Sequence, residues 1–272
     1  MRHVASLLVL SLVVALARPA VATVLLTDDF SVGSVTAETF NDTLASTQGG
    51  SLATVTYNVQ GVDFVAQHGN GNAMLLANSG APGFGYGNVS LNNDFAGNAN
   101  SANAPLTISF NIVTVTGYTD GSRWVQFNLG GAQNLAVGDN GVGVGIYFTQ
   151  FGDGSLLSGG SLLPSSSFRW SPSDLVSITL SDTAGTGSAF NSNGSRATVQ
   201  VGATTVGTFT LAQQSIAYAN FSAYNYSNDQ FGYGQFDNLS VSVVAVPEPS
   251  MALFGVAAAV GLVVRRRTSR AG

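Results

Sequence analysis

The sequence contains no cysteine and no lysine, and charged residues make up only 8% of its 272 residues. The absence of cysteine excludes disulfides, thiolate metal sites and thiol nucleophiles. Three arginines and thirteen acidic residues lie between Thr23 and Val246, so this stretch carries a formal charge of −10. An acidic stretch without lysine repels polyanions, which excludes nucleic acid as a partner.

The first 22 residues have the three-part layout of a secretory signal peptide. Met1 to His3 is a short basic start, Val4 to Leu16 is apolar, and the small residues Ala20 and Ala22 suit a cleavage site after Ala22. This order of a basic, an apolar and a small-residue region is typical of secretory signals. We therefore expect residues 1–22 to be removed on export.

The C-terminal segment has three parts of a different kind. Two prolines flank Glu248, Met251 to Val264 are fourteen apolar or small residues, and three consecutive arginines follow. Fourteen residues are few for a membrane span, which usually takes about 17 to 25. The prolines separate this stretch from the preceding chain, and basic residues stay on the cytoplasmic side of a membrane. The pattern predicts a short hydrophobic helix at the membrane, with the rest of the chain outside.

Residues 246–272 resemble the sorting signal of the PEP-CTERM proteins of Gram-negative bacteria, which consists of a Pro-Glu-Pro motif, a short hydrophobic helix and a basic tail. In that family an exosortase is thought to recognise the signal, cleave near the motif and pass the protein to the cell surface or an extracellular matrix. The resemblance implies an exosortase-type processing enzyme as partner and a membrane anchor before processing. It assigns the sorting motif to Pro247, Glu248, Pro249, Arg265, Arg266 and Arg267.

Residues 23–245 are predicted to form one all-β domain. Leu106, Ile108, Phe110 and Ile112 alternate with polar residues, which places them on one face of a strand. Pairs such as Asn-Gly and Asp-Gly between the runs supply the positive φ angles of tight turns. About ten short strands of this kind favour a two-sheet antiparallel β-sandwich. The strands are expected at 53–59, 63–66, 73–77, 106–112, 124–129, 143–149, 175–180, 197–201, 205–211 and 235–244.

The order of these runs is similar to that of concanavalin A-like and laminin-G-like jelly rolls. The resemblance rests on Asp28-Asp29-Phe30, on Gly145 to Phe148 and on Phe236 to Val241. It implies that the first and last strands pair and that sugar binding is common among relatives. It does not by itself establish sugar binding in this chain.

The paired terminal strands suggest a metal site. Asp28, Asp29 and Asp237 would meet there, and jelly rolls of this kind often carry a structural calcium ion in this region. Calcium takes six to eight oxygen ligands, which carboxylates and carbonyls supply. We therefore consider a structural Ca²⁺ at Asp29 and Asp237. The alternative is that both aspartates cap turns or strand edges.

Aromatic residues cluster between positions 218 and 233. Rings beside amide side chains suit sugar binding, because a pyranose face stacks on a ring and its hydroxyl groups bond to polar groups. The candidate glycan-binding residues are Tyr218, Tyr224, Tyr226, Tyr233 and Asn225. The alternative is that half of the rings alternate into the core, and Trp124 and Trp170 are expected to pack there.

Catalytic signals are weak. Glu38 is the only glutamate between the two ends, and nothing in the sequence pairs it with an aspartate as glycoside hydrolysis requires. His68 is the only histidine after the signal and is predicted in a turn, and no G-x-S-x-G motif occurs. We therefore expect a non-catalytic protein that binds polysaccharide. A structural surface protein without a small ligand and a glycoside-active enzyme remain the alternatives.

Overall fold

The computed structural model describes residues 22–30, 35–37, 48–52, 55–60, 64–69, 72–77, 85–116, 124–132, 142–190, 195–211, 218–225 and 232–244. These segments belong to one compact unit, Ala22–Val244. Within several strands the structure describes the backbone course alone. Residues 1–21 of the predicted signal peptide, the C-terminal hydrophobic helix, the sorting motif, Glu38 and Tyr226 lie outside the described residues.

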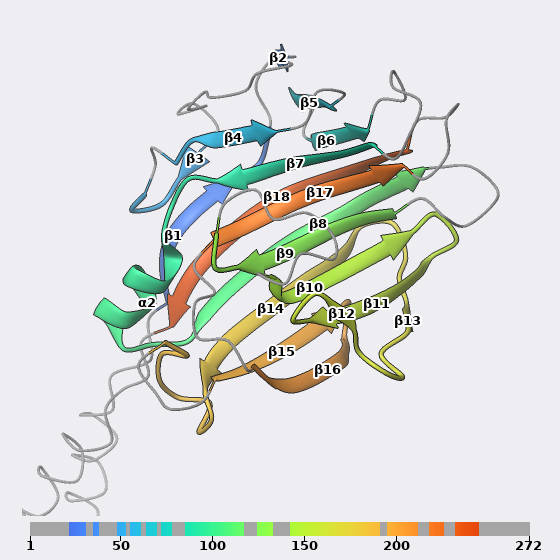
Figure 1. The fold of residues 1–272 in the computed structure, drawn as a ribbon. Helices are drawn as coiled ribbons and strands as arrows, with labels where there is room; N and C mark the ends of the chain where they lie inside the picture. The colour runs from blue at the N-terminus through green and yellow to red at the C-terminus, as the bar shows by residue number, and fades with distance from the viewer. Residues whose placement is uncertain are drawn as a thin grey trace, which may run out of the picture. The chain divides into compact units, whose positions relative to one another are not determined.

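The first of two sheets, sheet A, contains ten strands (Figure 1). Its main order is β16-β15-β14-β8-β18-β6-β5-β2, and β1 pairs with both β18 and β3. The predicted pairing of the first and last strands is confirmed, because β1 lies antiparallel to β18. The strands are β1 (Ala22–Asp28), β2 (Val35–Ala37), β3 (Gln48–Gly49), β5 (Phe64–Gly69), β6 (Asn72–Ala77), β8 (Leu106–Thr116), β14 (Asp174–Asp182), β15 (Ser195–Val201), β16 (Thr204–Leu211) and β18 (Gly232–Val244).

The second sheet, sheet B, contains eight strands in the order β12-β11-β10-β9-β17-β7-β4, with β13 beside β11. Neighbouring strands are antiparallel here as in sheet A. The prediction of a two-sheet antiparallel sandwich is therefore confirmed. The strands are β4 (Tyr57–Gln60), β7 (Gly85–Leu91), β9 (Trp124–Gly130), β10 (Val142–Thr149), β11 (Asp153–Ser158), β12 (Ser161–Leu162), β13 (Phe168–Arg169) and β17 (Tyr218–Asn225).

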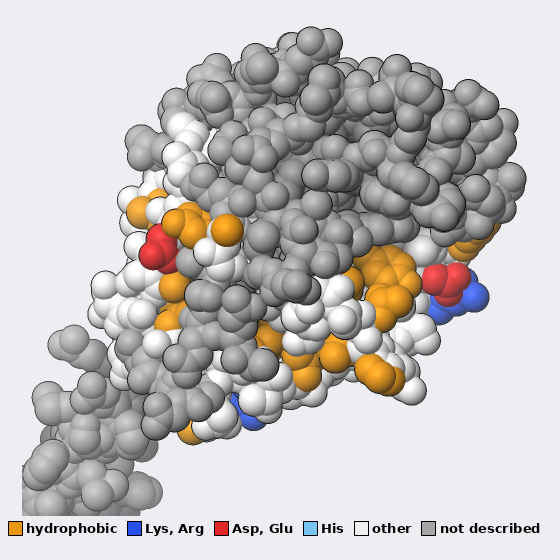
Figure 2. All heavy atoms as spheres, viewed as in Figure 1, with side chains coloured by type: hydrophobic (Ala, Val, Ile, Leu, Met, Phe, Trp, Pro, Cys, Tyr) orange, Lys and Arg blue, Asp and Glu red, His pale blue; other side chains and the backbone are white. Residues whose placement is uncertain are grey.

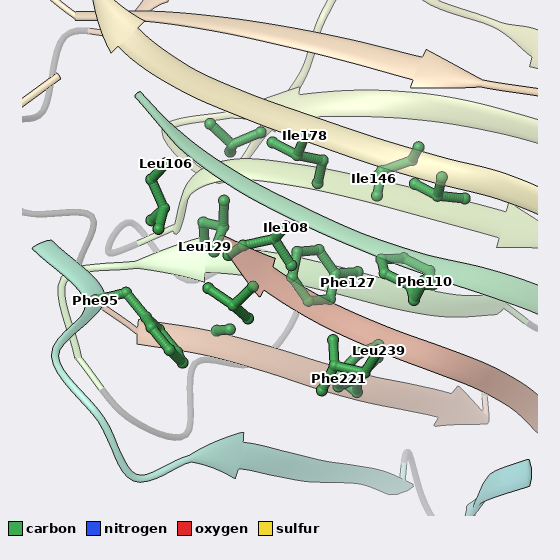
Figure 3. Close-up of a cluster of buried hydrophobic side chains, with 14 of the residues drawn as sticks. Phe95, Leu106, Ile108, Phe110, Phe127, Leu129, Ile146, Ile178, Phe221 and Leu239 are labelled. Carbon is green, nitrogen blue, oxygen red and sulfur yellow. The ribbon is translucent and has the colours of Figure 1, made fainter. Parts of the chain in front are cut away.

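A cluster of phenylalanine rings lies between the two sheets (Figure 3). Phe110 of sheet A is 4.9 Å from Phe127 and 5.3 Å from Phe221 of sheet B, measured between ring centroids. Phe236 of sheet A completes the cluster at 5.4 Å from Phe110. Alternation predicted the strands of Phe110, Phe127 and Phe236, because every second side chain of a strand faces the other sheet.

Trp170 packs at the edge of this core, as predicted. It is 8% exposed and meets Phe148 edge to face at 5.9 Å. Its indole N–H donates to the carbonyl oxygens of Thr149 and Asp153. For Trp124 only the backbone is described, as part of β9.

One helix occurs in the described part of the chain, α2 (Phe95–Ala102). Asp94 caps its N-terminus by accepting the N–H groups of Ala96 and Gly97. The sequence pattern does not predict this helix, because it is only eight residues long and buries only Phe95 and Ala99. Among the described residues no helix is long and apolar enough to cross a membrane.

Five strands of sheet B were not expected from the sequence: β7, β11, β17 and the two-residue strands β12 and β13. β17 is a central strand between β9 and β7, although the sequence suggested a binding loop in this region. His68 was expected in a turn and instead lies in β5, because the hairpin to β6 turns after Gly69, which pairs with Asn72. The prediction of a turn at His68 is therefore wrong.

Candidate functional site

The face of sheet B that points away from the core carries two ranks of uncharged polar positions. On β9, Val125, Phe127 and Leu129 are core residues, so Gln126 and Asn128 point to the opposite face. Strand pairing extends these two positions across five strands. One rank runs through Tyr147, Gln126, Ser222, Asn88 and Gln60, and the other through Gly145, Asn128, Asn220, Ser90 and Asn58.

We call the members whose side chains are described and fully buried the amide row: Gln126, Asn128, Asn220, Ser222 and Ser90. Each has 0% of its surface exposed. The Gln126 amide donates to Asn128 Oδ1, and Asn128 Nδ2 lies 3.4 Å from Ser222 Oγ. Gln126 Oε1 has no hydrogen-bond partner in the structure. A buried carbonyl oxygen without a partner is costly, so this atom is the least satisfied part of the row.

Gly145 of β10 makes room for the amide row. A Cβ atom at this position would lie 2.8 Å from Asn128 Oδ1 and 3.0 Å from Gln126 Nε2. Ordinary Cβ contacts are longer, and both neighbouring side chains are fully buried. The glycine is therefore required for the two amides to lie over this strand.

The amide row has no group for acid–base chemistry. Its amides and hydroxyls both donate and accept hydrogen bonds. It contains no carboxylate, histidine or arginine side chain. Figure 2 shows that charged side chains are also sparse on the described part of the face in view. The row therefore lacks the paired carboxylates that glycoside hydrolysis needs.

Tyr218 and Tyr147 lie next to the row and are only half-buried. Tyr218 shares one face of β17 with Asn220 and Ser222, because alternate residues of a strand point the same way. The amide Nδ2 of Asn220 lies 3.4 Å from the Tyr218 carbonyl oxygen. A half-buried ring thus lies beside a row of buried hydrogen-bonding groups.

The aromatic residues proposed from the sequence do not form one loop. The backbones of Tyr224 and Asn225 lie in β17 of sheet B, whereas the backbone of Tyr233 lies in β18 of sheet A. Their side chains are outside the described part of the structure, and so is all of Tyr226. The candidate glycan-binding residues therefore do not lie in one loop. Tyr218 is the one candidate whose side chain the structure describes.

The two aspartates proposed as metal ligands do come close together. A bulge in β18 places Asn238 at a φ of 52°, and the Asn238 N–H donates to Asp237 Oδ1 at 2.6 Å. Burial raises the pKa of Asp237, the N–H of Asn238 lowers it, and the negative charge of Asp29 raises it again, so that it lies above its ordinary value. Asp237 thus accepts the hydrogen bond that caps the bulge, and the negative charge of Asp29 repels its carboxylate.

The amide oxygen of Asn111 also lies at the bulge of β18, but few further charges do. Asn238 Nδ2 lies 3.3 Å from Asn111 Oδ1 and 3.1 Å from Asp237 Oδ2. Within the described segments no group of three or more histidine, cysteine or acidic residues is placed to hold a metal ion. Two carboxylates and neighbouring amide oxygens are donors that calcium accepts, although they fall short of its usual six to eight ligands.

Asp28 has a different environment from its neighbour Asp29. It is 1% exposed, and its carboxylate accepts the Tyr57 hydroxyl at 2.5 Å and the Phe30 N–H at 2.9 Å. The bond from Tyr57 connects β1 of sheet A with β4 of sheet B, whereas the bond from Phe30 is local. Asp28 therefore joins the two sheets, a role that the sequence did not indicate.

Several solved structures share parts of this fold. A sialidase matches with a TM-score of 0.44 at 11% identity over 78% of this chain, which spans only 19% of the sialidase. Lectin II from Ulex europaeus gives 0.40 at 13% identity, with 69% of this chain and 92% of the lectin covered. The carbohydrate recognition domain of Emp47p gives 0.43 at 11% identity, with 70% and 89% covered.

Sequence comparisons do not assign this chain to a family. No protein-family model matches this chain, and no curated protein matches it significantly. The structural similarities are too low to carry an assignment of ligand or activity. The function is therefore argued from the side chains.

Proposed function

We propose that this chain is an exported surface protein whose β-sandwich binds a neutral glycan without cutting it. The observation that carries the proposal is the half-buried ring of Tyr218, which lies on the outer face of sheet B beside the uncharged and buried amide row. Sugar hydroxyls pair well with amides, and a sugar ring stacks on tyrosine. In this proposal Tyr218 contacts the glycan directly, and the row fixes the position of its strand.

The described aspartates support binding over hydrolysis, because structural contacts occupy them. Asp94 caps α2, and Asp153 forms an exposed ion pair with Arg169 at 3.1 Å. Asp174 accepts the Ser171 N–H at 2.7 Å, and Asp182 accepts the Thr186 N–H at 2.9 Å. Asp29 and Asp237 carry like charges that repel one another, and we propose that they hold a structural calcium ion rather than act on a sugar.

Tyr218→Ala tests the glycan proposal most simply. The mature chain would be screened against an array of neutral polysaccharides and glycans, and the best ligand titrated by calorimetry. Loss of one stacked ring is expected to weaken binding at least about tenfold, because aromatic residues dominate such contacts. Phe151→Ala is the matched control, since Phe151 is 52% exposed in the turn between β10 and β11. Unchanged affinity in Tyr218→Ala would remove this ring from the site.

Export and sorting form the second part of the proposal. The basic, apolar and small-residue order of residues 1–22 supports secretion, and the Pro-Glu-Pro, apolar and arginine order of residues 246–272 supports processing by an exosortase. Intact mass of the chain from its native host tests both ends. A mass corresponding to a start at Thr23 and a loss near Pro247 is expected. Full-length chain in the cytosol would contradict the proposal.

We also propose a more specific fold than a two-sheet sandwich. The pairing of β1 with β18 and the two facing antiparallel sheets support a concanavalin A-like jelly roll. An experimental structure with a curved sheet B and the strand order given above is the expected result. A different order in sheet B would contradict this assignment.

A further inference from the structure

Strand β16 is the longest edge among the described strands that end a sheet. It spans the eight residues Thr204–Leu211 at one end of sheet A, where its only partner is β15 (Figure 1). The other end of sheet A is the three-residue β2. Sheet B ends with the two-residue β12 and the four-residue β4. A long edge strand presents a row of backbone donors and acceptors to a further strand.

The sequence of β16 lacks the side chains that usually block such pairing. TTVGTFTL contains no charged residue and no proline. Natural edge strands are commonly protected by lysine, proline or a bulge. The one irregularity in the pairing with β15 lies between Val199 and Gln200, so the half of β16 from Gly207 to Leu211 stays regular.

The surface beside this edge carries few charges, since Arg196 of β15, opposite Thr210, interacts with the opposite charge of Asp182. Thr208 and Thr210 are exposed, and the Thr208 hydroxyl lies 3.4 Å from that of Thr198 on β15. Farther into the sheet, the hydroxyls of Thr107 and Thr179 lie 3.1 Å apart. Hydroxyl groups therefore continue from the edge across the outer face of sheet A.

We propose that β16 pairs in antiparallel register with β16 of a second copy of this chain, which joins the two copies of sheet A into one continuous sheet. A twofold axis places the same strand against itself, and threonine pairs across antiparallel strands are favourable. The acidic chain repels its own copies elsewhere, but the uncharged β16 does not. A charged peptide would find no complementary charge along the strand, so a second copy is the partner that this edge fits.

Hydrogen exchange measured over a range of protein concentrations tests the proposal on the unmodified chain. Peptides covering Thr204–Leu211 should become more protected as concentration rises, in step with a monomer–dimer transition seen by analytical ultracentrifugation. Peptides from the opposite edge at β2 should not change. A chain that stays monomeric, or a dimer that protects a different segment, overturns the proposal, and so does protection of β16 that is independent of concentration.

A charged edge gives the second test. Thr208→Lys with Thr210→Lys puts like charges opposite one another in the paired strands, which should raise the dimer dissociation constant by about tenfold or more. Val24→Lys with Phe151→Lys is the charge-matched control, because Val24 and Phe151 are 40% and 52% exposed and lie outside β16. Equal weakening in both double variants would indicate general repulsion and would contradict pairing through β16.

Discussion

Asp237→Asn removes one of two like charges that the structure holds together at the bulge of β18. The pKa of Asp237 lies above its ordinary value of 3.8, because burial and the charge of Asp29 outweigh the N–H of Asn238. A carboxyl group with a raised pKa binds its proton more tightly in the folded chain than in the unfolded chain. The folded chain therefore loses stability as pH rises through the interval between the ordinary and the raised pKa. Asp237→Asn should not show this loss.

The expected gain is small, because Asp237 is half-buried and solvent screens the repulsion. We expect Asp237→Asn to stabilise the metal-free chain at neutral pH by about 0.2–1 kcal/mol, the range for exposed charge pairs. In a domain of this size that is a rise in Tm of about 0.5–4 °C. Below the ordinary pKa of aspartate the two chains should unfold at similar temperatures, since both side chains are then neutral.

Thermal unfolding followed by circular dichroism, in chelator and over a series of pH values, measures this difference. Asp29→Asn is the matched variant and should give a smaller gain, because it removes the repulsion but leaves the Asp237 charge buried. The double variant should gain nothing beyond Asp237→Asn. A lower Tm for Asp237→Asn at neutral pH, or a difference that does not depend on pH, would refute the reasoning. Added calcium should raise the Tm of the wild-type chain and not that of Asp237→Asn, because a ligand bound only to the folded state stabilises it. No rise in the wild-type chain would end the calcium proposal.

Three further substitutions test the packing described above, each by denaturant unfolding. Phe110→Ala should lower the free energy of unfolding by about 3–5 kcal/mol, because it empties the centre of the ring cluster; a loss as small as that of a surface substitution would contradict this packing. Gly145→Ala should destabilise the fold by about 1–3 kcal/mol, because the added Cβ clashes with the amide row. Gly97→Ala in α2, where a Cβ meets nothing closer than 3.8 Å, should stabilise it by about 0.4–1 kcal/mol. Equal effects of the two substitutions would show that the side chains of the row move aside at little cost. Tyr57→Phe should cost about 1.5–3 kcal/mol by removing a donor from the buried carboxylate of Asp28, and a neutral result would contradict that bond.

Alternation in the sequence was enough to predict most long strands. In β8 and β14 the core residues alternate with hydroxyl residues that face solvent, so the two faces differ in hydropathy. β17 breaks this rule, because Asn220 and Ser222 are as buried as Ala219 and Phe221. A strand that is buried on both faces and polar on one has no simple periodic signal, and its tyrosines suggested a loop instead.

The candidate site was only partly predictable. The nearness of Asp29 and Asp237 followed from pairing the first and last strands, which a fold resemblance supplied. The amide row depends on contacts between distant segments, as between Asn128 and Ser222, which are 94 residues apart. Gln126 and Asn128 were visible as the polar members of an alternating strand, but their burial was not. The sequence alone does not show which outer faces are covered.

The central claim is that the sandwich binds neutral glycan and leaves it intact. The most direct measurement incubates the mature chain with neutral polysaccharide, and follows both its retention on the polymer by co-sedimentation and the appearance of new reducing ends. The account predicts retention that Tyr218→Ala weakens, with no increase in reducing ends. Absence of retention on every neutral polysaccharide, or release of reducing ends by the wild-type chain, would contradict it.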